Sequence, residues 1–120
     1  MDDGIAGIAA AFSRHRFAEV YPHLAEDVRW DLVGERQVVG RAEVVSTCEQ
    51  TAGYLAAGVT TDFRRFRVVA GGDGVVVDSE AEYVDADGES TVVASCDLYD
   101  FAGGRLTAIR SYTVQLDGAG

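Results

Sequence analysis

Asp97 is a charged residue in a stretch of chain that otherwise has the pattern of a buried strand. With the alternation typical of a strand, Asp97 shares one face of the segment 90–101 with Val93, Ser95 and Tyr99. A carboxylate on an interior face must be paired, hydrogen-bonded or protonated, because burial disfavours its charge. The ordinary alternative is a strand aspartate that a neighbouring hydroxyl or amide satisfies. Asp97 is the first candidate for acid–base chemistry.

Asp31 is the second candidate. It stands between Trp30 and Leu32 in the segment 28–33, the only strand expected in the N-terminal half. If Asp31 and Asp97 face one cavity, low dielectric and like charge favour one ionised base and one protonated donor. Such a pair transfers protons at neutral pH. The alternative for Asp31 is an exposed residue at a strand end or in a turn.

The elements that would position these residues follow from the hydrophobic pattern. Apolar residues recur at helical spacing in the first half, and β-branched and aromatic residues dominate the second half. We expect helices over 5–12, 17–24 and 41–57, and strands over 60–70, 75–84, 90–101 and 106–116. Short glycine-containing turns separate these strands, which predicts an antiparallel meander without parallel pairing, because no crossover helix lies between them. The predicted fold class is α+β, one domain over 1–120, with three N-terminal helices on a curved, mostly antiparallel sheet.

The segment 90–101 is mostly apolar on both faces. Val92, Ala94, Cys96 and Leu98 lie on the face opposite Asp97. The helices cover one face of the sheet, so burial of the other face requires a second subunit. We therefore expect a homodimer through the outer sheet face.

The 120 residues carry ten basic and twenty acidic side chains, which gives a formal net charge of −10. An acidic surface repels phosphates and anionic lipids, so we expect neither nucleic acid nor a membrane as a partner. Within it, Arg64, Arg65 and Arg67 form a basic cluster that we expect to pair with carboxylates of a neighbouring strand. The N-terminal residues do not resemble a signal peptide, and Cys48 and Cys96 fit buried thiols better than a disulfide. These features favour a cytoplasmic location.

The sequence shows no pattern for a metal or a cofactor. His15 and His23 lack a second histidine or a cysteine at ligand spacing, so we predict no metal. The glycine pairs at 71–72 and 103–104 are typical of hairpins, since no helix follows them to bind a phosphate. We expect no cofactor.

Several segments resemble a known protein family. They are 23–34, with the sequence HLAEDVRWDLVG, 91–101, TVVASCDLYDF, and 103–112, GGRLTAIRSY. They resemble the SnoaL-like polyketide cyclase and ketosteroid isomerase branch of the nuclear-transport-factor-2-like (NTF2-like) superfamily, over nearly the whole chain. The resemblance implies a cone-shaped NTF2-like fold that encloses a pocket. It places Asp31 at the family's general base and Asp97 at its protonated, oxyanion-binding acid.

The sequence departs from this family at two positions. Ketosteroid isomerases carry an oxyanion-binding tyrosine on the first helix, where residues 8–12 read IAAAF, so Tyr21, Tyr54 or Tyr99 would have to supply a phenol. Epoxide-hydrolase-like relatives carry an aspartate on the final strand, where this chain has Ser111, which disfavours that reaction. The residues expected to bind a substrate are Phe12, Leu24, Tyr54, Tyr99 and Ser111.

The resemblance implies a cofactor-independent acid–base enzyme of the isomerase or cyclase type. Its expected partner is a hydrophobic small molecule, a ketone of polyketide-like or terpenoid-like character, bound in a buried cavity. The alternative is a non-catalytic domain of the same fold that binds a ligand or mediates dimerisation. The missing tyrosine on the first helix favours that alternative.

Overall fold

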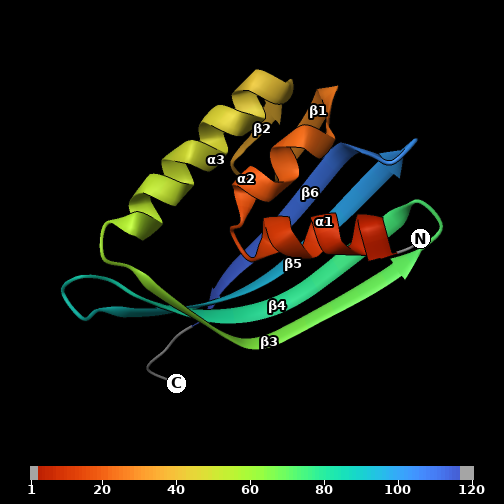
Figure 1. The fold of residues 1–120 in the computed structure, drawn as a ribbon. Helices are drawn as coiled ribbons and strands as arrows, with labels where there is room; N and C mark the ends of the chain where they lie inside the picture. Colours follow the sequence, from red (N-terminus) through yellow and green to blue (C-terminus); the bar gives the residue numbers. More distant parts are fainter. Residues whose placement is uncertain (1–2, 117–120) are drawn as a thin grey trace.

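A computed structural model of the protein describes residues 3–116, in which the strands form one six-stranded sheet with helices gathered on one side (Figure 1). The strand order is β2-β1-β6-β5-β4-β3. The strands are β1 (Leu24–Leu32), β2 (Arg36–Val39), β3 (Thr60–Gly71), β4 (Gly74–Val84), β5 (Ser90–Ala102) and β6 (Arg105–Leu116). The helices are α1 (Asp3–Ser13), α2 (Phe17–Val20), the 3-10 turn η1 (Tyr21–His23) and α3 (Arg41–Ala56).

The four C-terminal strands form the predicted antiparallel meander. Each of β3, β4 and β5 pairs with its successor in the chain, from Thr60↔Val84 to Ala102↔Arg105. Gly72 and Gly103 both have a φ of 59°, a left-handed conformation that glycine adopts without steric cost in tight turns. The α+β class and the meander are therefore confirmed.

The N-terminal half differs from the expectation in three ways. The four C-terminal strands pair without parallel neighbours, as predicted, but β6 also pairs in parallel with β1, a contact that was not predicted, and the chain between these two strands, which includes α3, serves as the crossover. The helix expected over 17–24 ends at Val20, and Pro22 lies in the first turn of η1, where its missing N–H is tolerated. The sequence analysis also missed β2, which at four residues is too short to show a period.

The core lies between the helices and the inner face of the sheet. Helix α1 packs against β4 and α3 packs against β1, as the ribbon shows (Figure 1). Phe12 of α1 lies at its centre, with its ring centroid 5.0 Å from that of Trp30 and 5.9 Å from that of Tyr99. Edge-to-face contacts of this kind add to the stabilisation from burial. Of the helices in residues 3–116, none has the length and apolar character needed to cross a membrane.

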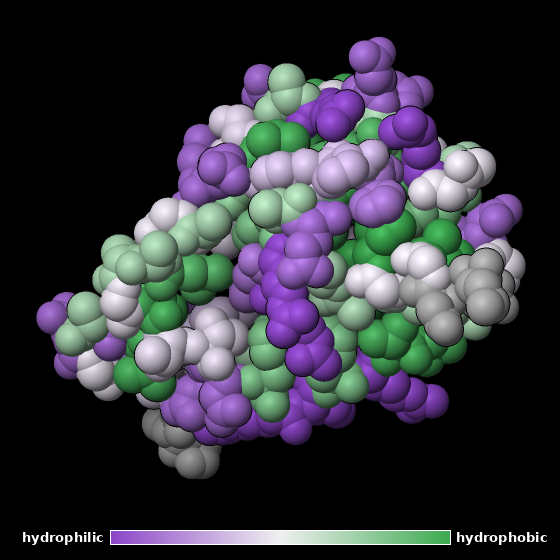
Figure 2. Space-filling model, in the orientation of Figure 1, coloured by the Kyte–Doolittle hydropathy of each residue, from purple (hydrophilic) through white to green (hydrophobic). Residues whose placement is uncertain are grey.

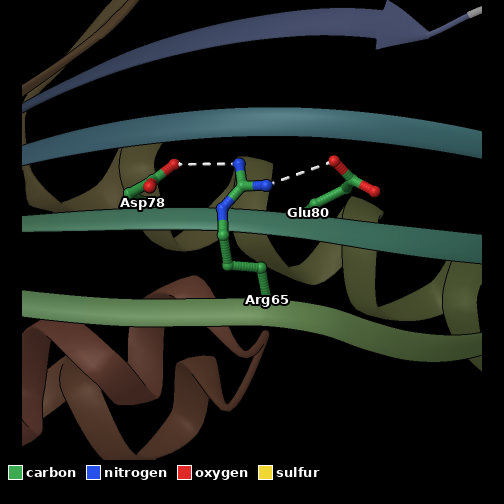
Figure 3. Close-up of polar contacts among 3 residues, drawn as sticks. All are labelled: Arg65, Asp78 and Glu80. Carbon is green, nitrogen blue, oxygen red and sulfur yellow. Dashed lines mark hydrogen bonds and ion pairs between the residues drawn. The ribbon is translucent and has the colours of Figure 1, made fainter.

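The outer face of the sheet carries ion pairs at the β3 edge. Arg65 on β3 reaches across to Asp78 at 3.2 Å and Glu80 at 3.3 Å on β4 (Figure 3). Arg64 pairs with Glu82 at 2.9 Å. The predicted cross-strand pairing is confirmed for these two arginines. In the space-filling view, hydrophilic residues gather along the lower edge, where β3 lies in Figure 1 (Figure 2).

Candidate functional site

A cavity of about 430 Å³, which we call the inner cavity, lies between the helices and the sheet. Its apolar walls come from α1, α2, β1 and β5. They include Phe12, Phe17, Trp30, Leu32 and Val93. Its hydroxyl groups come from Ser13, Thr47, Thr51, Ser79, Tyr83, Ser95, Ser111 and Thr113. Small-molecule sites typically have volumes of about 300–1,000 Å³ and mostly apolar walls with a few polar groups. The inner cavity has the size and composition of such a site.

Asp97 lines the inner cavity from the middle of β5. It pairs across the sheet with Ser111 of β6 and Val77 of β4, and strand alternation turns its half-buried side chain toward the helices. Ser13 Oγ, at the end of α1, donates a hydrogen bond to Asp97 Oδ2 at 2.9 Å. The same Ser13 oxygen lies 2.6 Å from the hydroxyl of Tyr99, which is buried below the cavity. Asp97 is thus held by hydroxyl groups rather than by a cation.

Burial raises the pKa of Asp97, and hydrogen bonds from Ser111, Ser13 and Tyr99 offset part of that rise. Burial and the nearby Asp97 charge raise the pKa of Tyr99 well above its usual range, so this phenol stays protonated. A carboxyl with a raised pKa gives up and accepts a proton closer to neutral pH than an ordinary aspartate does. Asp97 therefore has the environment of an acid–base group.

The side chains of Asp31 and Asp97 lie on opposite faces of the sheet. Strand alternation on β1 turns Trp30 toward the inner cavity, where its Nε1 donates to Ser111 Oγ at 3.0 Å. Asp31 points to the outer face of the sheet, in a surface depression beside Arg110, with Asp31 Oδ2 3.9 Å from Arg110 Nε. The expected pair of carboxylates in one cavity is wrong, because the period of two separates Asp31 from the face that Trp30 occupies.

The other predicted substrate-binding residues lie in three environments. Phe12 and Ser111 line the inner cavity, and Tyr99 contributes to it through the hydrogen bond of its hydroxyl to Ser13. Tyr54 lines a second cavity of about 290 Å³, the outer cavity. Leu24 is 1% exposed, packs in the hydrophobic core and lines neither cavity.

His15 and Tyr83 are cavity residues that the sequence analysis missed. His15 Nε2 lies 3.0 Å from the hydroxyl of Tyr83, and both residues line both cavities. Burial lowers the pKa of His15, which keeps its imidazole neutral at pH 7. Burial and the Asp97 charge raise the pKa of Tyr83. The sequence signal is a histidine just after the first helix, at a position without metal-ligand spacing.

Other chemistries find less support among the described side chains. Within residues 3–116, no three histidine, cysteine or acidic side chains are grouped to hold a metal ion. Burial raises the pKa of the Cys48 thiol to about 12, which leaves little thiolate for nucleophilic attack. The ten basic residues of the sequence are all arginines, so the chain offers no lysine for a Schiff base. The titratable side chains of the inner-cavity lining are His15, Glu35, Arg36, Tyr83 and Asp97, and among them Asp97 is the carboxyl whose pKa burial raises.

Comparisons with known proteins agree with this architecture. Residues 5–109 match the family profile of the SnoaL-like domain. An NTF2-like protein of unknown function from Cytophaga hutchinsonii superposes with a TM-score of 0.84 and 26% identity, covering 95% of this chain and 99% of that one. No curated protein matches the sequence.

Two further solved structures share the fold at lower identity. One is a proposed polyketide cyclase from Xanthomonas campestris, with a TM-score of 0.72, 23% identity and coverage of 92% of this chain and 90% of that one. The other is an LEH-like epoxide hydrolase from M. tuberculosis, with a TM-score of 0.69, 17% identity and coverage of 94% and 81%. Since the SnoaL-like profile spans most of the sequence and the fold is that of NTF2-like proteins, the chain belongs to the SnoaL-like family of the NTF2-like superfamily.

Proposed function

We propose that the protein is a cofactor-independent acid–base enzyme that acts on a small hydrophobic ketone in the inner cavity. The observation that carries the proposal is the half-buried carboxyl of Asp97, held by Ser13 in a cavity of about 430 Å³, with a pKa that burial raises. Cyclase and epoxide hydrolase structures of the same fold support catalysis as the use of this cavity.

Asp97 is the group that moves the proton in this proposal. Its carboxylate removes a hydrogen from the carbon next to the ketone, and the electron pair of the broken C–H bond passes to the carbonyl oxygen as an enolate. When the ketone carries a β,γ double bond, that bond extends the enolate, and return of the proton from Asp97 to the γ-carbon moves the double bond into conjugation, which is an isomerisation. In the cyclase variant, the enolate carbon attacks a second carbonyl of the same molecule, and the resulting alkoxide takes the proton. Neither route needs an oxidant or a reductant.

Tyr83 is the proposed donor to the enolate oxygen. Its raised pKa keeps the phenol protonated, and it lines the cavity that Asp97 lines. When neutral His15 carries its proton on Nε2, it donates to the Tyr83 oxygen, which leaves the phenolic hydrogen free for the ligand. His15 is a positioning residue for Tyr83. This arrangement takes the place of the tyrosine that is missing from the first helix.

The test is hydrogen exchange, because it needs no knowledge of the natural substrate. We would incubate α-tetralone, 2-decalone and 2-heptanone with the protein in D2O and follow loss of the α-hydrogen signals by proton NMR. Asp97→Asn should reduce the protein-dependent exchange by about 100-fold or more, the usual contribution of a general acid–base group. Asp31→Asn is the matched control, because Asp31 lies on the outer face, and its rate should stay within about twofold of wild type.

The second candidate function is a non-catalytic ligand-binding domain. The observation that favours it is that the partners of Asp97 are hydroxyl groups, while Asp31 lies on the outer face of the sheet and forms no acid–base pair with Asp97. Binding of these ketones with no exchange above buffer would establish this candidate. Exchange that survives Asp97→Asn would remove Asp97 from the mechanism.

A further inference from the structure

We propose that the inner and outer cavities form one continuous groove for an elongated ligand, with its ketone in the inner cavity and a tail without negative charge in the outer cavity. This inference rests on the proposed function for the ketone end. It adds a second binding compartment and a shape and charge for the molecule that fills it.

Helix α3 lines both cavities along one face. Thr47 and Gln50 line the inner cavity, Thr51 lines both, and Tyr54 and Leu55 line the outer cavity. These spacings of three and four residues are those of one helix face. The two cavities therefore follow one another along α3.

Residues of β4 and β5 line the two cavities from the opposite wall, in the same order as the residues of α3. On each strand, every second residue faces the groove, and the three positions pass from inner to shared to outer. They are Ala81 and Tyr83 on β4 with Asp85 directly after its end, and, in the reverse chain direction on β5, Ser95, Val93 and Thr91. Helix α3 and strands β4 and β5 thus place the two cavities in the same order. The residues that line both cavities, Thr51, Tyr83 and Val93, lie between the inner and the outer positions on each element.

His15 completes the middle of the groove from the end of α1. Its backbone has a φ of 67°, a left-handed conformation that is uncommon for residues other than glycine and that asparagine, aspartate and histidine adopt more often than the rest. This conformation presents the imidazole to Tyr83, with the ring packed near Phe17 and Phe63. The residues that line both cavities include the rings of His15 and Tyr83, and flat surfaces of this kind suit a flat or chain-like ligand that extends from one cavity into the other.

The outer cavity has the character of a site for an apolar tail. Tyr54 is 62% exposed although it is a large aromatic residue, and it lies beside Leu55 and Val93 on the cavity wall. The charged residues at the rim are the carboxylates of Asp85 and Glu89, and no arginine is among the described residues of this lining. Asp85 is fixed there, because its Oδ1 accepts from the backbone N–H groups of Asp87 and Glu89 at 2.9 Å. This rim repels an anionic end and accepts a neutral or cationic one.

The first experiment uses methyl ketones from 2-pentanone to 2-undecanone as probes, with backbone amide NMR shifts as the readout. We expect the short ketones to shift the amides of Ser95 and Ser111 at the inner cavity. The longer ones should also shift Leu55 and Thr91 at the outer cavity, and affinity should rise about fourfold for each methylene buried.

The second experiment removes one aromatic side chain from the wall of the outer cavity. Tyr54→Ala should weaken binding of 2-undecanone at least fivefold and leave binding of 2-pentanone unchanged. Tyr112→Ala is the matched control, because it removes an exposed tyrosine from β6 outside both cavities, and it should change neither affinity. The carboxylate 10-oxoundecanoate should bind more weakly than 2-undecanone, and Glu89→Gln should reduce that difference.

The outcomes separate the two proposals. If the short ketones bind at the inner cavity but the longer ones bind no tighter and leave Leu55 and Thr91 unshifted, the continuous groove is overturned and the proposed function stands. Tighter binding of 10-oxoundecanoate than of 2-undecanone overturns the assigned tail charge. If none of the ketones shifts the inner amides, both proposals fail.

Discussion

At the scale of single residues, the surroundings of Asp97 favour proton transfer but lower the stability of the folded protein. Its carboxyl is taken out of water, which disfavours the charged form, and the hydroxyls that contact it are weaker partners than an arginine would be. The same environment that suits proton transfer therefore costs stability whenever Asp97 is ionised. Functional sites commonly carry such a cost.

Asp97→Asn should stabilise the folded protein more at pH 8 than at pH 4. Because the folded pKa of Asp97 is raised, the folded state binds more protons than the unfolded state above the ordinary pKa of about 3.9. The wild-type free energy of unfolding then falls with pH, by up to about 1.4 kcal/mol per pH unit, until the folded pKa is passed. The asparagine variant lacks this slope. Urea unfolding of both proteins across this range measures the difference, and a constant gap would contradict the prediction.

His15→Val should destabilise the protein more than His15→Asn, by about 1–2 kcal/mol. Both variants lose the contact with Tyr83, so the difference reports the backbone at φ 67°. A β-branched residue is strained in this left-handed conformation, whereas asparagine tolerates it. Chemical denaturation compares the two variants, and equal stabilities would show that the backbone relaxes when the imidazole is removed.

The pattern of the sequence was sufficient to find Asp97 but not its surroundings. An acidic residue among apolar neighbours on one strand face is visible as a break in a period of two. The same alternation places Asp31 with Asp27 and Arg29 on the polar face of β1, opposite Trp30, and it was the resemblance to the family that made Asp31 a candidate base. The role of His15 could not be predicted, because its partner Tyr83 lies 68 residues away along the chain and no local pattern specifies that contact.

At the scale of elements, α3 supplies one wall of both cavities, opposite the sheet. It begins after Gly40, whose backbone has φ 93° and ψ 148°, and it packs on β1 while its other residues line both cavities. The turn at Gly40 therefore sets the position of Thr47, Thr51 and Tyr54.

Gly40→Ala should destabilise the protein by about 1–3 kcal/mol, because this region of φ and ψ is open essentially to glycine alone. Gly53→Ala is the matched control within α3. Its added methyl group meets no atom within 4 Å, and removing a helical glycine should stabilise the protein by about 0.5–1 kcal/mol. Thermal unfolding by circular dichroism measures both changes. Equal effects of the two substitutions would contradict the assigned role of Gly40.

The elements that the sequence predicted correctly are those with long, regular patterns. The four C-terminal strands have 11 to 13 residues each and glycine turns between them, so period and punctuation agree. The pairing of β1 with β6 joins segments about 80 residues apart, and no local pattern specifies such a contact. Long-range pairing is decided by how the sheet and helices pack together.

At the scale of the whole molecule, the outer sheet face is the largest surface that the helices leave open. Leu98, Tyr112 and Val114 are 37%, 42% and 59% exposed on β5 and β6. Apolar side chains that are grouped on a sheet face are typical of an interface. A homodimer through this face remains our prediction.

Leu98→Asp should shift the protein from dimer to monomer, because it places a charge at the centre of the predicted interface. Light scattering after size exclusion should then report the chain mass of 12.8 kDa instead of twice that value. Val33→Asp is the control, since Val33 is exposed in the turn after β1 and not on a strand of this face. A wild-type protein that is monomeric at high concentration would refute the dimer.

The central claim is that Asp97 is a titrating acid in a cavity, and carbon-13 NMR of the carboxyl carbons tests it most directly. A pH titration of the wild-type protein, with Asp97→Asn to identify the signal, gives the midpoint for this one group. We predict a midpoint above the ordinary aspartate value of about 3.9, because burial disfavours the charged form. A midpoint at or below that value would show that the hydroxyl partners outweigh burial, and it would contradict the acid–base role.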